Sequence, residues 1–167
     1  MKAKVSSPKI AIYVGTFDPL TYGHLDIIER GSKIFDELVV SIGNNATKKE
    51  EFSVLERTRI LEEVCKGISS NIRISSFSGL AIEHALSQKA HVLLRGLRTE
   101  ADFVYEMQMA MMNRTLCKDL ETMFIPTRQD LSHISSSLVK EIAKLGGSLS
   151  QLVPLLVEEK LKQKYRL

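Results

Sequence analysis

The sequence contains no tryptophan, two cysteines, four prolines and no long apolar stretch. Cys65 and Cys117 lie far apart and form no Cys-X-X-Cys pair, so we expect reduced thiols rather than a disulfide framework or a cysteine zinc site. No apolar stretch approaches the roughly 20 residues that a membrane-spanning helix requires, so we expect no membrane partner.

Charge of neither sign is in large excess, because 23 lysines and arginines oppose 20 acidic residues, for a net charge of +3. No block of five like charges and no stripe of basic and aromatic residues occurs, so we expect no nucleic-acid partner. The 167 residues suit one domain spanning 1–167, with residues 1–8 as a short frayed leader. The basic N-terminus is not followed by the apolar segment of a signal peptide, which favours a cytoplasmic location.

Short apolar, β-branched stretches alternate with helix-like stretches along the chain. Strands are expected at residues 10–14, 38–42, 72–76, 91–94 and 123–126. Helices are expected from about Leu25 to Phe35, from Ser53 to about Lys66, from Ser78 or Gly79 to about Gln88, from Glu100 to about Asn113, from Ser135 or Ser136 onward, and near Pro154. Such alternation with short loops predicts an α/β fold with an open, mostly parallel sheet.

A polar loop follows each expected strand, at residues 15–24, 44–49, 77–80, 95–98 and 127–137. Open α/β sheets bind ligands at the carboxyl ends of their strands, so these loops predict one large site on one rim. The simpler explanation is that loops of α/β proteins are generally polar. Cations in three of these loops favour an anionic ligand.

The first loop, residues 15–24, precedes a helix that begins near His24. A helix N-terminus offers unpaired N–H groups and a positive dipole, which suits phosphate. Thr16 can donate a hydroxyl hydrogen bond, and Phe17 packs either against a flat ligand or into the core. His24 either stabilises charge that develops on a transferring phosphoryl group or is a capping or core histidine, and spacing alone favours neither.

Cations in later loops extend this candidate site. Lys48 either reaches an anionic substrate or belongs to a solvated surface turn, and its charge alone favours the turn. Arg95 and Arg98 suit bidentate recognition of phosphate, but they can also pair with Glu100 or Asp102.

The second half of the chain adds residues suited to a nucleotide. Glu106 either holds a ribose or adenine or pairs with an arginine. The stretch 135–137 opens a helix with three serines, which favours a second phosphate cradle over simple N-capping. His133 is a weaker candidate for a functional histidine than His24. The methionine-rich stretch 107–112 favours helix core or a subunit contact, and modestly favours oligomerisation.

Together these motifs resemble a known family. Residues 15–19 (GTFDP) and 21–24 (TYGH) resemble the GTFDP and TxGH signature of the nucleotidyltransferase superfamily. Residues 95–98 (RGLR), 102–108 (DFVYEMQ) and 134–141 (ISSSLVKE) are similar to motifs of bacterial phosphopantetheine adenylyltransferases. The resemblance runs from about Lys9 to about Lys160.

This resemblance implies a Rossmann-like α/β fold with about five parallel strands and flanking helices. It implies transfer of AMP from ATP to 4′-phosphopantetheine, which gives dephospho-coenzyme A and pyrophosphate in coenzyme A biosynthesis. Mg²⁺ would be carried by the ATP phosphates, with no metal ligand from the protein. Coenzyme A would be a feedback inhibitor, and the chain would form a homo-oligomer, namely a hexamer.

The resemblance also assigns roles to individual residues. His24 and Lys48 would be catalytic. ATP would contact Thr16, Phe17, His24, Gly96, Leu97, Arg98, Glu106, Leu131, Ser132, His133, Ile134, Ser135, Ser136 and Ser137. The phosphopantetheine would contact Thr16, Lys48, Ala81 and Arg95. The sequence departs from the family pattern at Val14, Gly79, Leu131 and His133, and none of these changes removes a phosphate-handling residue.

Other functions stay open. A nicotinate mononucleotide adenylyltransferase or a glycerol-phosphate cytidylyltransferase would share the first loop but not the pairing of RGLR with DFxYEMQ. A non-catalytic adenine-nucleotide sensor on the same fold would not require His24 and Lys48. A nucleic-acid-binding module is disfavoured by the mild net charge.

Overall fold

The computed structural model describes residues 8–44 and 50–166, so Lys48 lies outside the described residues. The elements are β1 (Ile10–Gly15), α1 (Tyr22–Ile34), β2 (Glu37–Gly43), α2 (Val54–Cys65), β3 (Ile72–Phe77), α3 (Ala81–Ser87), β4 (Val92–Leu97), α4 (Glu100–Leu116), β5 (Glu121–Pro126), the 3₁₀ turn η1 (Gln129–Leu131), α5 (Ser136–Lys144) and α6 (Leu155–Tyr165).

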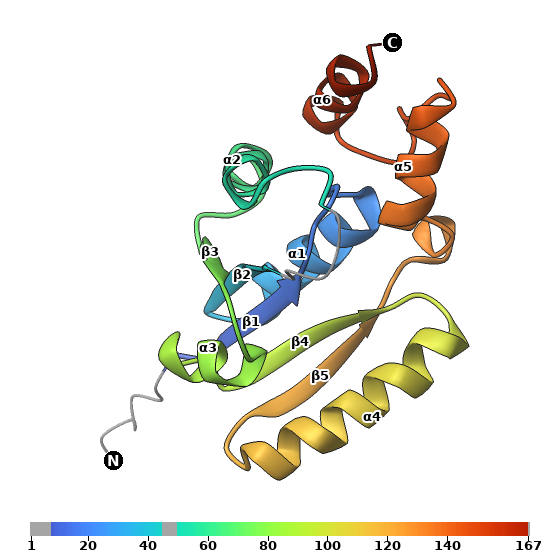
Figure 1. Cartoon of the computed structure of the whole chain (residues 1–167). Helices are drawn as coiled ribbons and strands as arrows, with labels where there is room; N and C mark the ends of the chain where they lie inside the picture. The colour runs from blue at the N-terminus through green and yellow to red at the C-terminus, as the bar shows by residue number, and fades with distance from the viewer. Residues whose placement is uncertain (1–7, 45–49, 167) are drawn as a thin grey trace.

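The strands form a parallel sheet in the order β3-β2-β1-β4-β5 (Figure 1). β1 pairs with β2 on one side and with β4 on the other, so the strand order reverses between β1 and β4. Such a reversal opens a crevice at the carboxyl ends of the two central strands. The Rossmann-like α/β fold expected from the sequence is confirmed.

Helices cover both faces of the sheet. Because successive strand residues point to opposite faces, Ala11 and Tyr13 belong to one hydrophobic core, and Ile10 and Ile12 belong to another. The larger core packs α1, α2, α5 and α6 against the sheet, and the smaller core packs α3. None of the residues of α4 is buried, and this helix runs along β4 and β5 at the edge of the molecule (Figure 1).

Side-chain caps set several helix starts as the sequence predicted. Ser53 caps α2, and Glu56 completes the capping box by accepting from the Ser53 N–H at 2.8 Å. Ser135 caps α5, since its Oγ accepts from the Leu138 N–H at 3.2 Å. α6 begins directly after Pro154.

Several predicted boundaries are wrong. α1 begins at Tyr22 rather than at about Leu25, and α4 ends at Leu116 rather than at about Asn113. The loop expected at residues 95–98 is largely strand, because Arg95–Leu97 continue the ladder of β4 alongside Phe124–Pro126. The third helix begins at Ala81 rather than at Ser78 or Gly79. Gly79 has φ +98, a left-handed conformation that a right-handed helix does not contain.

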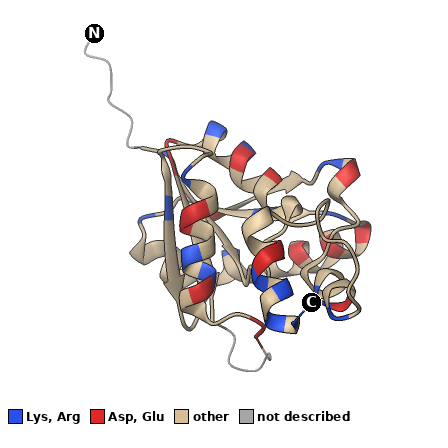
Figure 2. Cartoon of the chain, turned by 90° about the horizontal axis from the view of Figure 1, so that it is seen from above, with Lys and Arg blue, Asp and Glu red and all other residues tan. Residues whose placement is uncertain are grey.

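Charges of both signs are interspersed over the helices and loops (Figure 2). This distribution matches the small net charge of +3. No helix among the described residues is both long enough and apolar enough to cross a membrane.

Candidate active site

A cavity of about 270 Å³ lies at the carboxyl ends of β1 and β4, where the strand order reverses. Its walls come from β1, α1, β4, α4 and the start of α5, together with Thr127 after β5. The lining residues are Tyr13, Val14, Gly15, Thr21, Gly23, His24, Ile27, Arg95, Gly96, Arg98, Asp102, Glu106, Thr127, Ile134, Ser135, Ser136 and Ser137. The site therefore lies where the fold predicts a ligand.

His24 is built into the first turn of α1. The Thr21 N–H donates to its Nδ1 at 3.1 Å, and the Thr21 Oγ lies 3.0 Å from the same atom. In turn, the His24 N–H donates to the Thr21 Oγ at 3.4 Å, which makes a capping box with histidine in the place usual for glutamate. Because Nδ1 accepts from a backbone N–H, the neutral ring carries its proton on Nε2.

The surroundings of His24 disfavour its cationic form. Burial, and to a lesser extent the positive charge of Arg98, lower its pKa to about 4. A neutral imidazole with an Nε2–H donor thus borders the cavity at neutral pH. The capping interpretation left open by the sequence is correct, and His24 also lines the cavity, whereas its role towards a phosphoryl group stays a prediction.

Phe17 packs against His24 without lining the cavity. Its ring is 1% exposed and packs edge-on against His24, with centroids 5.2 Å apart, and against Tyr13 at 5.4 Å. A Cβ on Gly15 would lie 2.9 Å from the Phe17 ring, so glycine is required there by close approach. Phe17 therefore packs into the core, and its side chain does not line the cavity.

The N-terminus of α5 forms the opposite wall. Ser135 Oγ caps the Leu138 N–H, and Ser136 Oγ donates to the Pro19 carbonyl at 2.9 Å. The first backbone N–H groups of a helix have no intrahelical acceptor, so those of Ser136 and Ser137 are free to meet a ligand. The Ser135 cap is therefore compatible with anion binding by this turn, which stays a prediction.

Arg95 is held by Glu106 across the cavity wall. Its Nε and Nη2 donate to the two carboxylate oxygens at 2.8 and 2.6 Å, and its Nη1 donates to the Val14 carbonyl at 2.6 Å. Burial opposes the charge of Arg95, but the hydrogen bonds and charge of Glu106 outweigh it and raise the pKa of Arg95. The arginine pairing considered for Glu106 is therefore confirmed, and Arg95 does not pair with the Glu100 or Asp102 also considered from sequence.

Arg98 directly follows β4 and contacts the segment that precedes α5. It forms an ion pair with Asp102 through Nε at 3.0 Å and Nη2 at 3.2 Å, which is one of the pairings considered from sequence. Its Nη1 donates to the Ile134 carbonyl at 3.2 Å, directly before the three serines. A fixed positive charge therefore lies beside His24 and the start of α5.

The cavity gathers most of the residues predicted for nucleotide binding, namely His24, Gly96, Arg98, Glu106, Ile134, Ser135, Ser136 and Ser137. It also includes Arg95, which was predicted to contact the second substrate. The lining does not include Thr16, Phe17, Leu97, Leu131, Ser132 or His133. Ala81, predicted to contact the second substrate, opens α3 and also lies outside the lining. The prediction for Lys48 falls outside the described residues.

Several lining residues were not assigned from the sequence, namely Tyr13, Thr21, Asp102 and Thr127. Burial raises the pKa of Tyr13 to about 12, so its phenol keeps its proton at neutral pH. The sequence did contain a signal for Tyr13, because it is a tyrosine near the end of an otherwise aliphatic strand. A buried tyrosine hydroxyl usually forms a hydrogen bond with a polar group.

Among the described residues, no group of three or more His, Cys, Asp or Glu side chains could hold a metal ion. The two carboxylates that line the cavity, Asp102 and Glu106, are each paired with an arginine.

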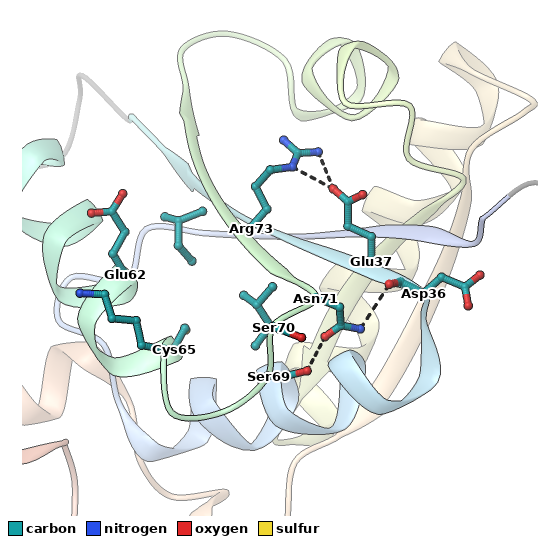
Figure 3. A pocket seen from close by; sticks show the side chains of 11 residues that line it. Asp36, Glu37, Glu62, Cys65, Ser69, Ser70, Asn71 and Arg73 are labelled. Atoms are coloured by element: carbon teal, nitrogen blue, oxygen red, sulfur yellow. Dashed lines mark hydrogen bonds and ion pairs between the residues drawn. The ribbon is translucent and has the colours of Figure 1, made fainter.

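A second cavity, of about 880 Å³, lies at the amino ends of β2 and β3 (Figure 3). Much of its polar lining is already paired, since the Asn71 side-chain amide donates to the carbonyls of Ser32 and Phe35 at 2.9 and 3.0 Å. Arg73 Nε donates to Glu37 at 2.8 Å. These contacts hold the end of α1 and the sheet edge.

Comparison with known proteins agrees with this geometry. Residues 12–142 match the family model described as cytidylyltransferase-like. The chain is similar to a protein from Vibrio parahaemolyticus assigned as a nicotinate-nucleotide adenylyltransferase, with 18% identity over 96% of each chain and a TM-score of 0.70.

Two further solved structures share the fold. The Plasmodium falciparum nicotinic acid mononucleotide adenylyltransferase complexed with NaAD is 17% identical over 96% of this chain and 97% of its own, with a TM-score of 0.62. A lipopolysaccharide core biosynthesis protein from Thermoplasma volcanium is 18% identical over 73% of this chain and 99% of its own, with a TM-score of 0.56. At these identities the likeness concerns the fold alone.

Proposed function

We infer that this chain, which belongs to the cytidylyltransferase-like family of the nucleotidyltransferase superfamily, transfers an adenylyl group from ATP to 4′-phosphopantetheine. The products would be dephospho-coenzyme A and pyrophosphate. One observation supports nucleotidyl transfer above the others. The imidazole of His24 is fixed by hydrogen bonds and borders the cavity between the N-termini of α1 and α5. The acceptor is chosen from the resemblance of RGLR, DFVYEMQ and ISSSLVKE to one branch of the superfamily.

In this proposal the phosphate of 4′-phosphopantetheine attacks the α-phosphorus of ATP in line, and pyrophosphate leaves. The protein positions two anions and stabilises the added negative charge. His24 Nε2–H donates to an α-phosphate oxygen, because its Nδ1 is already occupied by Thr21. The free N–H groups at the start of α5 and the charge of Arg98 hold the β- and γ-phosphates.

Arg95 keeps donors for the acceptor phosphate despite its pairing. A guanidinium has five N–H groups, and three are used by Glu106 and Val14. One N–H on each terminal nitrogen stays available for a phosphate oxygen. Glu106 then orients the arginine and also borders the nucleotide side of the cavity.

Mg²⁺ carried by the ATP phosphates would neutralise charge on the leaving pyrophosphate. A cytoplasmic location and feedback inhibition by coenzyme A belong to the same proposal, and both rest on the resemblance of the motifs.

We also propose a hexamer, with α4 contributing to its contacts. The helix has no buried residue, and its large apolar side chains are exposed, namely Phe103, Val104, Tyr105, Met109, Met111, Met112 and Leu116. Monomeric proteins rarely leave so many together, which supports a contact with another copy. Sedimentation would report the number of copies, and a monomer at micromolar concentration would contradict the proposal.

One assay tests the reaction. The protein is mixed with ATP, Mg²⁺ and 4′-phosphopantetheine, and pyrophosphate and dephospho-coenzyme A are measured. A parallel reaction contains nicotinate mononucleotide as the acceptor. Product with nicotinate mononucleotide alone would replace the proposed acceptor, and no product with any acceptor would favour a nucleotide sensor.

The Lys48→Ala variant tests the assignment of the acceptor side. The KM for 4′-phosphopantetheine should rise by more than the KM for ATP, because the lysine is proposed to hold only the acceptor. Equal increases in both KM values would contradict that role.

A further inference from the structure

Arg57 is a buried charge that the proposed reaction does not use. It lies on α2, it is 1% exposed, and its Nη1 donates to the Thr16 carbonyl at 2.8 Å. Its Nη2 lies 2.5 Å from a carboxylate oxygen of Glu50, close but without the alignment of a hydrogen bond. The arginine thus joins α2 to the first loop across 41 positions of sequence.

Stability alone is a poor reason for this arrangement. Withdrawing a guanidinium from water is costly, and a buried ion pair is often matched or exceeded in stability by apolar residues of similar volume. α2 packs into an apolar core through Ile60, Leu61 and Cys65, where such a residue would fit. The hydrogen bond to Thr16 is therefore the feature that requires an arginine.

The peptide that Arg57 holds is the strained one. The Thr16 carbonyl belongs to the peptide bond that leads into Phe17, and Phe17 has φ +49, an outlier for a bulky side chain. A residue in this region stays there only when its surroundings fix it. The Phe17 ring, so directed, packs against the imidazole of His24.

We propose that Arg57 is a positioning residue for adenylyl transfer, holding the turn between Thr16 and Phe17 so that the Phe17 ring sets the orientation of His24. The inference rests on the proposed function of that site. A second tie holds the same loop, since the carboxylate of Asp18 accepts from the N–H groups of Glu51 and Phe52 at 2.7 and 2.9 Å. Arg57 thereby fixes the part of the loop that Asp18 does not reach.

The test replaces Arg57 by methionine, which has similar length and no donor. Steady-state kinetics should show kcat reduced by about ten- to a hundredfold, the scale of a small misplacement of a catalytic group, with a smaller change in the KM for ATP. The midpoint of urea unfolding should fall as well, because the Glu50 carboxylate and the Thr16 carbonyl lose their partner, so the kinetics and the spectra decide the role. The Arg57→Lys variant, which keeps the charge and one donor nitrogen, should recover part of the kcat.

A second readout does not depend on activity. Long-range ¹H–¹⁵N spectra report the tautomer of each of the four histidines, and the His24→Gln variant assigns the His24 signals. In Arg57→Met these signals should shift from the Nε2–H tautomer towards a mixture. The matched control is Arg73→Met, which removes an arginine paired with Glu37 at the distant cavity and should change neither kcat nor the His24 signals.

A lowered unfolding midpoint with unchanged kcat and unchanged His24 signals would show a purely structural role and overturn the proposal. If the wild-type protein transfers no adenylyl group, the proposed function fails, whereas the spectra still decide whether Arg57 orients His24. If Arg57→Met does not fold, the double variant Glu50→Gln/Arg57→Met, which leaves no unpaired carboxylate, is judged by the same spectra and kinetics, with wild-type behaviour in both overturning the proposal.

Discussion

The two cavities at opposite ends of the sheet differ in the side chains that line them as well as in volume. The cavity at the amino ends of β2 and β3 holds about 880 Å³, and the cavity at the carboxyl ends of β1 and β4 holds about 270 Å³. The larger one is lined by surface ion pairs and an asparagine that holds the end of α1. The smaller one gathers a constrained histidine, two paired arginines and the N-termini of two helices.

The difference follows from how parallel strands are connected. At the carboxyl ends, chain leaves the two central strands towards opposite faces of the sheet, so loops from distant parts of the sequence meet around one space. The cavity at the amino ends is lined instead by two short stretches of the chain, within residues 36–37 and 62–74. Convergence of charged and polar groups, rather than volume, therefore marks the site, and four experiments compare the two regions.

Replacement of His24 by alanine should have the largest effect. Turnover should fall by at least about 100-fold, the scale of losing one transition-state donor, while ATP binding is largely kept. Steady-state kinetics and calorimetric titration with ATP measure the two quantities. The control is His91→Ala, an exposed histidine next to the amino end of β4. Turnover of His24→Ala near that of the wild type would remove the role of the imidazole.

The pH dependence of stability should also single out His24. Its pKa in the folded protein is about 4, below the ordinary 6.5, so the unfolded chain binds a proton that the folded chain lacks between these values. The fold should therefore lose about 2 to 3 kcal/mol through this residue as pH falls from 6.5 to 4, and nothing above 6.5.

Urea unfolding of the wild type and of His24→Gln across this pH range isolates that contribution from those of the carboxylates. The glutamine keeps an oxygen that can accept from the Thr21 N–H, and it does not titrate. Parallel pH curves for the two proteins would show that His24 titrates normally in the fold.

The ion pairs at the two cavities should differ in how much they contribute to the free energy of unfolding. Arg95 and Glu106 are 28% and 13% exposed, whereas Arg73 and Glu37 are 48% and 34% exposed. Glu106→Gln should lower the free energy of unfolding by about 2 kcal/mol, because a charged hydrogen-bond acceptor is lost in a sheltered place. Glu37→Gln should lower it by less than about 1 kcal/mol. Equal losses in urea unfolding would contradict this contrast.

Two glycines offer the smallest and most local comparison. Gly15→Ala places a Cβ 2.9 Å from the Phe17 ring and should destabilise the fold by about 1 kcal/mol or more. Gly67→Ala, next to the lining of the larger cavity, meets nothing within 4 Å and should be neutral or slightly stabilising. Thermal denaturation compares the pair, and a loss of similar size at Gly67 would show that space at Gly15 is not the cause.

Much of the fold could be predicted from the sequence, since β-branched runs alternate with capped amphipathic helices. The end of β4 could not, because Arg95 and Gly96 resemble a loop by local propensity. Pairing with β5 extends the strand through them. Gly96 is not explained by a turn. Glycine is needed there because a Cβ would lie 2.9 Å from the Ile27 side chain of α1.

The candidate site was predictable where short-range patterns carry it. His24 and the three serines stand at helix starts, which their spacing in the sequence indicates. The sequence allowed Glu106 to pair with an arginine but did not identify Arg95, because the two residues are 11 positions apart on different elements. The burial of Arg57 could not be predicted either, since a charged residue on a helix is normally solvated. Such pairings depend on tertiary packing rather than on local pattern.

The capping box of α1 has a consequence for local unfolding. The hydrogen bond from the Thr21 N–H to Nδ1 secures the first turn of the helix and also fixes the imidazole. Opening of that turn and release of the ring are therefore one event, and it requires no global unfolding. The hydrogen-exchange rate of a single backbone amide, that of Thr21, thus measures the fraction of molecules in which His24 is correctly held.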